Sequence, residues 1–191
     1  MKQSIYNAGV TMHKKTNLVW IDLEMTGLDP EHHVILEIAS IITTKDLDVV
    51  AQGPQLVIQQ SPEAFDHMDE WPQEQHTKSG LLEKVKRSQT TVESAAQQTL
   101  DFIKQYCEEG ASPLCGNSVW QDRNFLKRHM PSVLNFLHYR IIDVSTVKEL
   151  VLRWYAGNPQ SEFEKKDTHR ALDDILESIE ELRHYKSNFF V

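Results

Sequence analysis

The first third of the chain alternates between short apolar runs and turn residues, which is the pattern of β-strands. Residues 18–23 and 34–43 are rich in Ile, Val and Leu, as is typical of strands buried on both faces. Residues 47–59 predict a third strand, and its interruption at Gly53-Pro54 indicates a bulge or an edge strand. Because the links between these runs are short, we expect an antiparallel meander.

After residue 90 the apolar positions recur with helical spacing. A helix is predicted from Val92, and Thr90 with Glu93 fits a capping box at its start. The elements predicted beyond it are a strand at 113–117, a helix from about 119 to 129, a strand at 139–143, a helix at 145–154 and a helix from about Thr168. Strands followed by alternating helices and strands predict an α/β fold, with a mixed sheet that is antiparallel first and then parallel, flanked by helices.

Composition narrows the class of protein. The 28 acidic residues outnumber the 20 basic ones, and a net charge of −8 argues against a protein that coats long nucleic acid or an anionic membrane. No apolar run approaches the roughly 20 residues of a membrane span, and Cys107 and Cys115 are too few for a disulfide framework. We expect a cytoplasmic protein with a flexible leader at 1–16 and one domain at 17–191.

The first candidate chemistry is a pair of carboxylates where the first strand ends. Asp22 and Glu24 are two residues apart, so both side chains face the same side of the strand. Two like charges at this place repel each other, and a divalent cation such as Mg²⁺ or Mn²⁺ relieves the repulsion. An isolated pair of this kind also occurs at solvated strand ends, so the pair alone does not decide the function.

Further candidates lie in the second half of the chain. Asp122 falls within a predicted helix, where aspartate is a poor helix former. His169 and Asp174 stand at the start of the last helix, and a histidine near carboxylates is a candidate general base near neutral pH. Each of these residues, taken singly, also has an ordinary structural explanation.

Together these residues resemble the DEDDh family of 3′–5′ exonucleases, in the ribonuclease H-like superfamily, over residues 17–185. The resemblance is closest to members that act on very short RNA. The motifs that carry it are WIDLEMTGL at 20–28, GNS at 116–118 with Asp122-Arg123, HYR at 138–140 with DVST at 143–146, and HRALDD at 169–174.

The resemblance implies a ribonuclease H-like fold and a 3′-to-5′ exoribonuclease that degrades RNA down to dinucleotides, releasing 5′-mononucleotides. It implies two divalent cations, Mg²⁺ or Mn²⁺, held by Asp22, Glu24, Asp122 and Asp174, with His169 as the base that activates water. Helical spacing from His169 instead favours Asp173, four residues further on. We follow the family pattern, with Asp174 as ligand and Asp173 in a supporting role.

The resemblance also implies residues that bind substrate, and a homodimer in which some of them reach the site from a second subunit. Leu28 resembles an apolar wedge between bases, and Trp71 and His76 lie in a segment similar to a loop on the substrate side. Ser118, Arg140 and Ser145 resemble the polar residues that surround the terminal phosphate in this family. Tyr139 resembles a tyrosine beside the active site. Leu28 and Trp71 are also explained as ordinary apolar contacts, and Arg140 as a surface ion pair.

Three other functions are compatible with parts of the pattern. A related exonuclease for tRNA ends or polymerase proofreading is expected to carry basic patches. This chain has basic pairs such as Lys14-Lys15 and Lys165-Lys166, but no run of three or more consecutive Lys or Arg residues. A non-catalytic nucleotide-binding module is expected to lack one acidic residue or the histidine, yet all five are present. A glycosidase that uses a carboxylate pair would need no metal, so a chelator distinguishes it from a nuclease.

Overall fold

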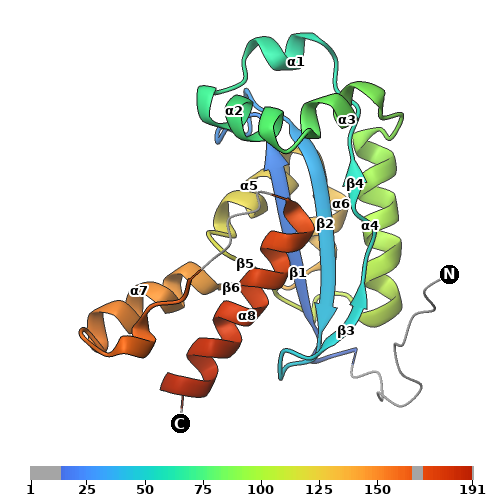
Figure 1. Ribbon diagram of the computed structural model, residues 1–191. Helices are drawn as coiled ribbons and strands as arrows, with labels where there is room; N and C mark the ends of the chain where they lie inside the picture. Colours follow the sequence, from blue (N-terminus) through green and yellow to red (C-terminus); the bar gives the residue numbers. More distant parts are fainter. Residues whose placement is uncertain (1–13, 165–169, 191) are drawn as a thin grey trace, which may run out of the picture.

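A computed structural model describes residues 14–164 and 170–190, which form a mixed six-stranded sheet with helices on both faces (Figure 1). The strand order is β3-β2-β1-β5-β6, and β4 also pairs with β2. The strands are β1 (Leu18–Met25), β2 (Ile35–Thr43), β3 (Val49–Gln52), β4 (Leu56–Val57), β5 (Leu114–Gly116) and β6 (Ile141–Asp143).

The predicted topology of the sheet is confirmed. Strands β1, β2 and β3 pair antiparallel, whereas β5 and β6 join β1 in parallel register. The interruption predicted at Gly53-Pro54 separates β3 from β4. A Cβ atom at Gly53 would collide with the side chains of Ser40 and Phe102, so the close approach of this loop to β2 and to helix α4 (Val92–Tyr106) requires glycine.

Helices cover the sheet and close its end. Thr91 is the N-cap of α4, and its hydroxyl accepts a hydrogen bond from the Ser94 N–H at 3.2 Å, so the predicted capping box of Thr90 and Glu93 is wrong by one residue. The helices are α1 (Glu63–Asp66), α2 (Glu70–Lys78), α3 (Leu81–Arg87), α4 (Val92–Tyr106), α5 (Trp120–His129), α6 (Pro131–Phe136), α7 (Val144–Trp154), the 3₁₀ turn η1 (Pro159–Ser161) and α8 (Ala171–Phe189).

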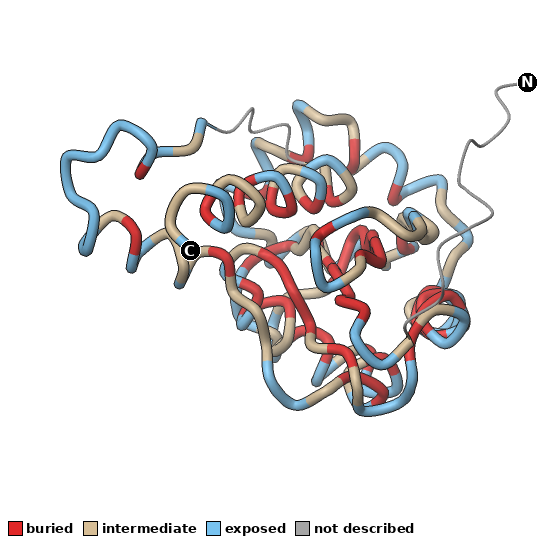
Figure 2. The backbone as a smooth tube through the Cα atoms, turned by 90° about the horizontal axis from the view of Figure 1, so that it is seen from below, coloured by how far each residue is buried: buried red, intermediate tan, exposed pale blue. Residues whose placement is uncertain are grey.

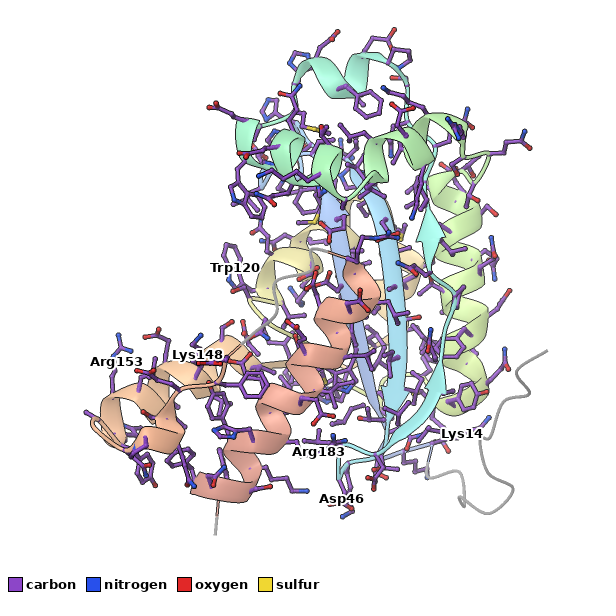
Figure 3. All side chains as sticks on the ribbon, in the orientation of Figure 1. Lys14, Asp46, Trp120, Lys148, Arg153 and Arg183 are labelled. Atoms are coloured by element: carbon purple, nitrogen blue, oxygen red, sulfur yellow. The ribbon has the colours of Figure 1, made fainter. Side chains whose placement is uncertain are left out.

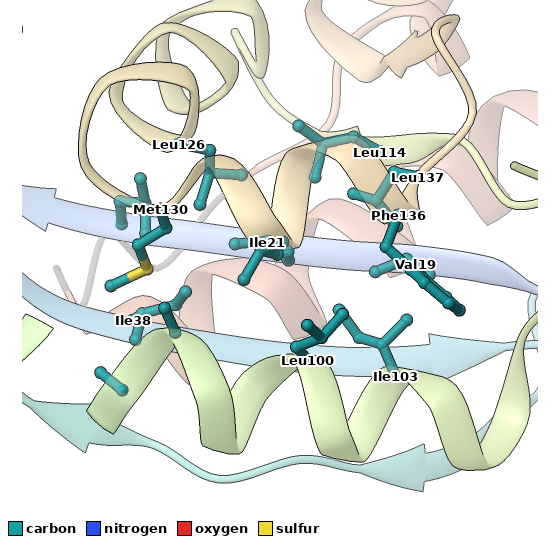
Figure 4. Packing of buried hydrophobic residues seen from close by; sticks show 14 of the residues in the cluster. Val19, Ile21, Ile38, Leu100, Ile103, Leu114, Leu126, Met130, Phe136 and Leu137 are labelled. Atoms are coloured by element: carbon teal, nitrogen blue, oxygen red, sulfur yellow. The ribbon is translucent and has the colours of Figure 1, made fainter. Parts of the chain in front are cut away.

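The central strand β1 divides the core into two layers. Val19 and Ile21 point toward α4, α5 and α6, where they meet Leu100 and Ile103 (Figure 4). Trp20 is fully buried and points to the opposite face, which α7 and α8 cover. Seen from below in Figure 2, the buried stretches gather in the middle of the molecule, and the exposed stretches lie mostly at its margins. This alternation follows from the twofold period of a strand whose two faces are both covered.

The same alternation determines where the acidic pair lies. Trp20, Asp22 and Glu24 share the α8 face of β1, and the register with β2 stays regular as far as Glu24. Helix α8 begins only at Ala171, and among the described residues the apolar cluster on this face includes no residue of β1 beyond Trp20. Helices α2 and α3 lie beyond the end of the strand (Figure 1). Asp22 and Glu24 therefore stand in a partly open space between β1, α2 and the start of α8.

The described residues contain no helix that is both long and apolar enough to cross a lipid bilayer. Near the N-terminus, the carbonyl of Lys14 accepts a hydrogen bond from the Glu108 N–H at 3.2 Å, and the Lys15 ammonium lies 3.9 Å from the Glu108 carboxylate. Residues 14–16 therefore run beside the end of α4.

Candidate active site

Three carboxylates meet at the end of β1. Asp22 and Glu24 extend from the same face of the strand, as predicted, and Asp174 joins them from the first turn of α8. One oxygen of each lies within 4.8 Å of the others. We call Asp22, Glu24 and Asp174 the carboxylate cluster.

The start of α8 decides which of the two neighbouring aspartates enters the cluster. Arg170 is the extended N-cap residue, so the helix begins at Ala171 and not near Thr168 as predicted. Asp174 donates its backbone N–H to the Arg170 carbonyl at 3.0 Å and turns its side chain toward β1, whereas Asp173 is exposed. The positive end of the helix dipole also favours an anion in this first turn.

Asp122 stands beside the cluster, and a backbone hydrogen bond holds it there. Strand β5 pairs with β1 only at Val19 and Trp20, which leaves the N–H of Leu23 beyond the end of β5. The Asp122 Oδ1 atom accepts this N–H at 3.0 Å from α5. Asp122 is buried, and its charge contributes to the raised pKa of Asp22.

Burial and the charges of neighbouring carboxylates raise the pKa of Asp22, Glu24 and Asp122. Burial first, and then the charges of Asp122 and Glu24, raise the pKa of Asp22 well above its ordinary value. Burial raises the pKa of Asp122 to about 8, and burial together with the charge of Asp174 raises that of Glu24 to about 8. Ionising several carboxylates this close together is costly without a counter-charge. A hard divalent cation, which prefers oxygen ligands, would offset this cost and favour the ionised forms of all four groups.

We expect the stability of the metal-free protein to fall as the pH rises from about 6.5 to 8. The folded chain keeps protons on Glu24 and Asp122 that the unfolded chain has already released, so raising the pH through their pKa of about 8 favours unfolding. His129, whose pKa is lowered by burial, has the opposite effect, but only below its ordinary value of 6.5. The measurement is the melting temperature in chelator across this range.

Added Mg²⁺ should raise the melting temperature, and the increase should be larger at pH 8 than at pH 6.5, because cation binding displaces protons. A metal-free melting temperature that rose steadily from pH 6.5 to 8 would contradict the prediction.

The cluster lies in a cavity of about 630 Å³. Four of the residues predicted to bind substrate line it: Leu28, Trp71, His76 and Ser118. Leu28 and Trp71 are 67% and 60% exposed, an unusual state for large apolar side chains beside an acidic cavity.

His76 lies on a helix and not on a loop, which corrects the prediction for this segment. Asp69 is the extended N-cap residue of α2, and Pro72 falls in its first turn, where proline is tolerated. The helix buries His76, whose Nε2 atom is 2.9 Å from the Met25 carbonyl and whose Nδ1 atom is 3.7 Å from the Glu24 carboxylate. The segment contains few apolar residues, so its sequence carries little helical periodicity.

Ser118 and Ser145 come together at the side of the cavity. Ser118 has a left-handed backbone, with φ at 48°, and its N–H donates to Asp143 Oδ1 at 3.0 Å and to Ser145 Oγ at 2.9 Å. The two serine hydroxyl oxygens are 3.2 Å apart. Asp143 also caps α7 by accepting the N–H of Ser145 at 3.0 Å. The end of β6 and the start of α7 therefore hold this serine pair in place.

Tyr139 and Arg140 do not reach the cavity of their own chain. They precede β6, in which Ile141 is level with Leu114 of β5 and, through it, with Val19 of β1. Because these strands are parallel, the two residues stand at the opposite end of the sheet from the carboxylate cluster. Tyr139 is 70% exposed, and the Arg140 guanidinium lies 5.3 Å from the centre of its ring.

Comparison with known proteins identifies the family. A family model described as exonuclease matches residues 19–182. The chain is 55% identical to the oligoribonuclease of Ruthia magnifica over 93% of this chain and 98% of that one, and 53% identical to the oligoribonuclease of Dichelobacter nodosus over 94% and 98%. The chain belongs to the oligoribonuclease family of exonucleases.

Solved structures with the same fold are exonuclease I from Methylocaldum szegediense, at a TM-score of 0.62 and 15% identity, and E. coli exonuclease I bound to a dT13 oligonucleotide, at 0.63 and 13%. The two structural alignments cover 91% and 90% of this oligoribonuclease-family chain and 41% of each exonuclease I chain. The family assignment and the α/β fold class predicted from the sequence are thereby confirmed.

The sequence patterns did not predict a buried ion pair at the start of α8. Glu37 of β2 lies opposite Glu24 and is fully buried, and Arg170 donates to both of its carboxylate oxygens, at 2.9 and 3.3 Å. The sequence did contain one signal of this pair, because Glu37 stands inside a mostly apolar strand and a buried charge requires a partner. This pair fixes the residue that precedes α8 in the oligoribonuclease-family chain. His169, the predicted base, lies outside the described residues.

Proposed function

We propose that the protein is a 3′-to-5′ exoribonuclease that releases 5′-mononucleotides from very short RNAs, down to dinucleotides. The observation that supports this most directly is the carboxylate cluster in a cavity bordered by exposed Leu28 and Trp71. A cavity of about 630 Å³ is the size of a site for one small ligand and not a groove for a long strand. The net charge of −8 also disfavours long polyanions.

Two divalent cations, Mg²⁺ or Mn²⁺, would be held by Asp22, Glu24 and Asp174, with Asp122 completing the set. When bound, they supply positive charge to the phosphate oxygens and lower the pKa of a bound water. The chain contributes the fixed placement of the carboxylates, since β1, α5 and α8 each hold their acidic residue by backbone hydrogen bonds. In this role the four acidic residues are ligands whose charge the cations neutralise.

The remaining predicted residues act on water and on the RNA. His169 would take the proton from the attacking water, a role suited to a histidine near neutral pH. Leu28 and Trp71 would contact the bases through apolar surface, which accepts any base. The rigid placement of His76 against β1 and Glu24 supports a role in shaping this side of the cavity.

A homodimer would bring Tyr139 and Arg140 of a second copy to the cavity. One flank supports this arrangement because it exposes the large apolar side chains of Trp120, Leu150 and Trp154 on α5 and α7. Figure 3 shows Trp120 and Arg153 on this flank. The depression there includes Ser118 and Ser145, so it adjoins the cavity.

The two buried free cysteines suit a reducing compartment such as the cytoplasm.

The test is kcat/KM for 5′-phosphorylated RNAs of two, three, five and ten nucleotides, with Mg²⁺ and with excess chelator. We expect the highest efficiency for the dinucleotide and no turnover in chelator. Arg140→Ala should lower the dinucleotide efficiency by about 10- to 100-fold, the value of a charge-assisted hydrogen bond to a terminal phosphate, and should affect the ten-nucleotide RNA much less.

Arg87→Ala is the matched control, because Arg87 is an exposed arginine at the end of α3 that does not line the cavity. An efficiency that increases with RNA length, or an Arg140→Ala variant equally impaired at every length, would overturn the proposal and favour an exonuclease with an open groove.

A further inference from the structure

A buried carboxylate stands behind the cavity, and the roles proposed above do not use it. Glu181 lies two turns beyond Asp174 on α8 and is fully buried. Its Oε2 atom accepts the Asn117 amide N–H at 2.9 Å, and its Oε1 atom accepts the Tyr185 hydroxyl at 3.0 Å. Burial and the Glu181 charge raise the pKa of Tyr185, so this hydroxyl remains a donor.

Glu181 determines which way the Asn117 amide faces. The Glu181 Oε2 atom accepts its hydrogen bond from the amide nitrogen of Asn117, so this nitrogen points to α8. There the same nitrogen also donates to Ser178 Oγ at 2.8 Å, and the Ser178 hydroxyl donates to the Asp174 carbonyl at 2.8 Å. The loop that carries Asn117 is thereby tied to the helix turn that carries a member of the carboxylate cluster.

The opposite side of the same amide controls the serine pair. With its nitrogen facing Glu181, Asn117 presents its carbonyl oxygen to Ser145, whose hydroxyl donates to it at 3.0 Å. The Ser145 oxygen is then left to accept the N–H of Ser118. The Ser118 hydroxyl keeps a proton that is not committed to Asn117, and Ser118 lines the cavity. A flipped Asn117 amide would present its nitrogen to Ser145, so the Ser145 hydroxyl could no longer donate to Asn117.

We propose that Glu181 is a positioning residue that, with Tyr185, holds Asn117 so that the serine pair stands at a fixed distance and orientation from the carboxylate cluster. The inference rests on the proposed function, and it assigns the preference for a dinucleotide to this spacing. This spacing selects substrates by length. A dinucleotide can place its terminal phosphate at the serines and its scissile bond at the carboxylate cluster at the same time. Glu181 itself contacts neither phosphate nor base.

The test compares Glu181→Gln with Glu180→Gln, an exposed glutamate on the same helix. Glutamine can donate to Asn117 and allows its amide to flip. For Glu181→Gln, we expect the KM of the 5′-phosphorylated dinucleotide to rise at least 10-fold. Efficiency should change by less than about twofold for the ten-nucleotide RNA and for a dinucleotide with a 5′ hydroxyl. Glu180→Gln should match the wild type with all three substrates.

Rescue separates a positioning role from a purely structural one. The double variant Glu181→Gln/Asn117→Asp again presents an acceptor to Ser145, so it should recover most of the dinucleotide preference. Tyr185→Phe, which removes one donor to Glu181, should shift the preference in the same direction as Glu181→Gln. If Glu181→Gln does not fold, as judged by its thermal melt, Tyr185→Phe decides the question, and an unchanged dinucleotide preference in this variant overturns the positioning role.

Failure of the inference is distinguishable from failure of the proposed function. A wild-type protein without a preference for short RNA contradicts the function itself. A wild type that prefers the dinucleotide, together with a Glu181→Gln variant that keeps the same ratio between short and long RNA, overturns the positioning role alone. Equal losses on all substrates without recovery in the double variant also overturn it.

Discussion

Asp22→Asn is expected to lower the turnover of short RNA by more than about 100-fold while raising the melting temperature of the metal-free protein. The two effects have one cause. Asp22 is held close to three other carboxylates, so its charge is useful when cations are bound and costly when they are absent. Asparagine keeps the shape of the side chain, and it needs no proton to be buried beside the other carboxylates. A 100-fold loss corresponds to about 2.7 kcal/mol of transition-state stabilisation.

The measurements are kcat with saturating Mg²⁺ and the melting temperature in chelator. Asp101→Asn, an exposed aspartate on α4, serves as the control and should change neither quantity appreciably. Wild-type activity that persisted in excess chelator would refute the metal-dependent mechanism, and a destabilised metal-free Asp22→Asn would refute the electrostatic explanation.

The second large effect concerns the adjacent aspartates of α8. We expect Asp174→Asn to reduce turnover by at least about 100-fold and Asp173→Asn to remain within about twofold of the wild type. Asp174 belongs to the carboxylate cluster, whereas Asp173 is one residue earlier on the helix, about 100° around the axis, and is exposed. The two substitutions are chemically identical, so they control for each other.

Turnover of the two variants with Mg²⁺, and the increase in melting temperature on adding Mg²⁺, test this assignment. The increase should be reduced in Asp174→Asn and retained in Asp173→Asn. If Asp173→Asn were the inactive variant, the helix would begin at a different residue in the active protein, and the cluster described here would not be the metal site.

Local patterns along the chain were sufficient to predict the strands, the longer helices and the family. Strand and helix periods arise from local backbone geometry, so the runs at 18–23 and 34–43 and the spacing after Val92 could be interpreted without knowing what they pack against. The placement of Asp22 and Glu24 on one face followed from the same period. The motif set led to the family because it records residue types and their order along the chain.

Contacts between groups far apart in the chain depended on how the whole fold packs. The choice of Asp174 over Asp173 depended on the residue at which α8 begins, and the separation of Arg140 from the cavity depended on the parallel register of β6. Glu37 and Arg170 are 133 positions apart, and Asn117 and Glu181 are 64 apart. A buried charge requires a partner, but local sequence does not specify which one, because the partner is selected by the packing of whole layers.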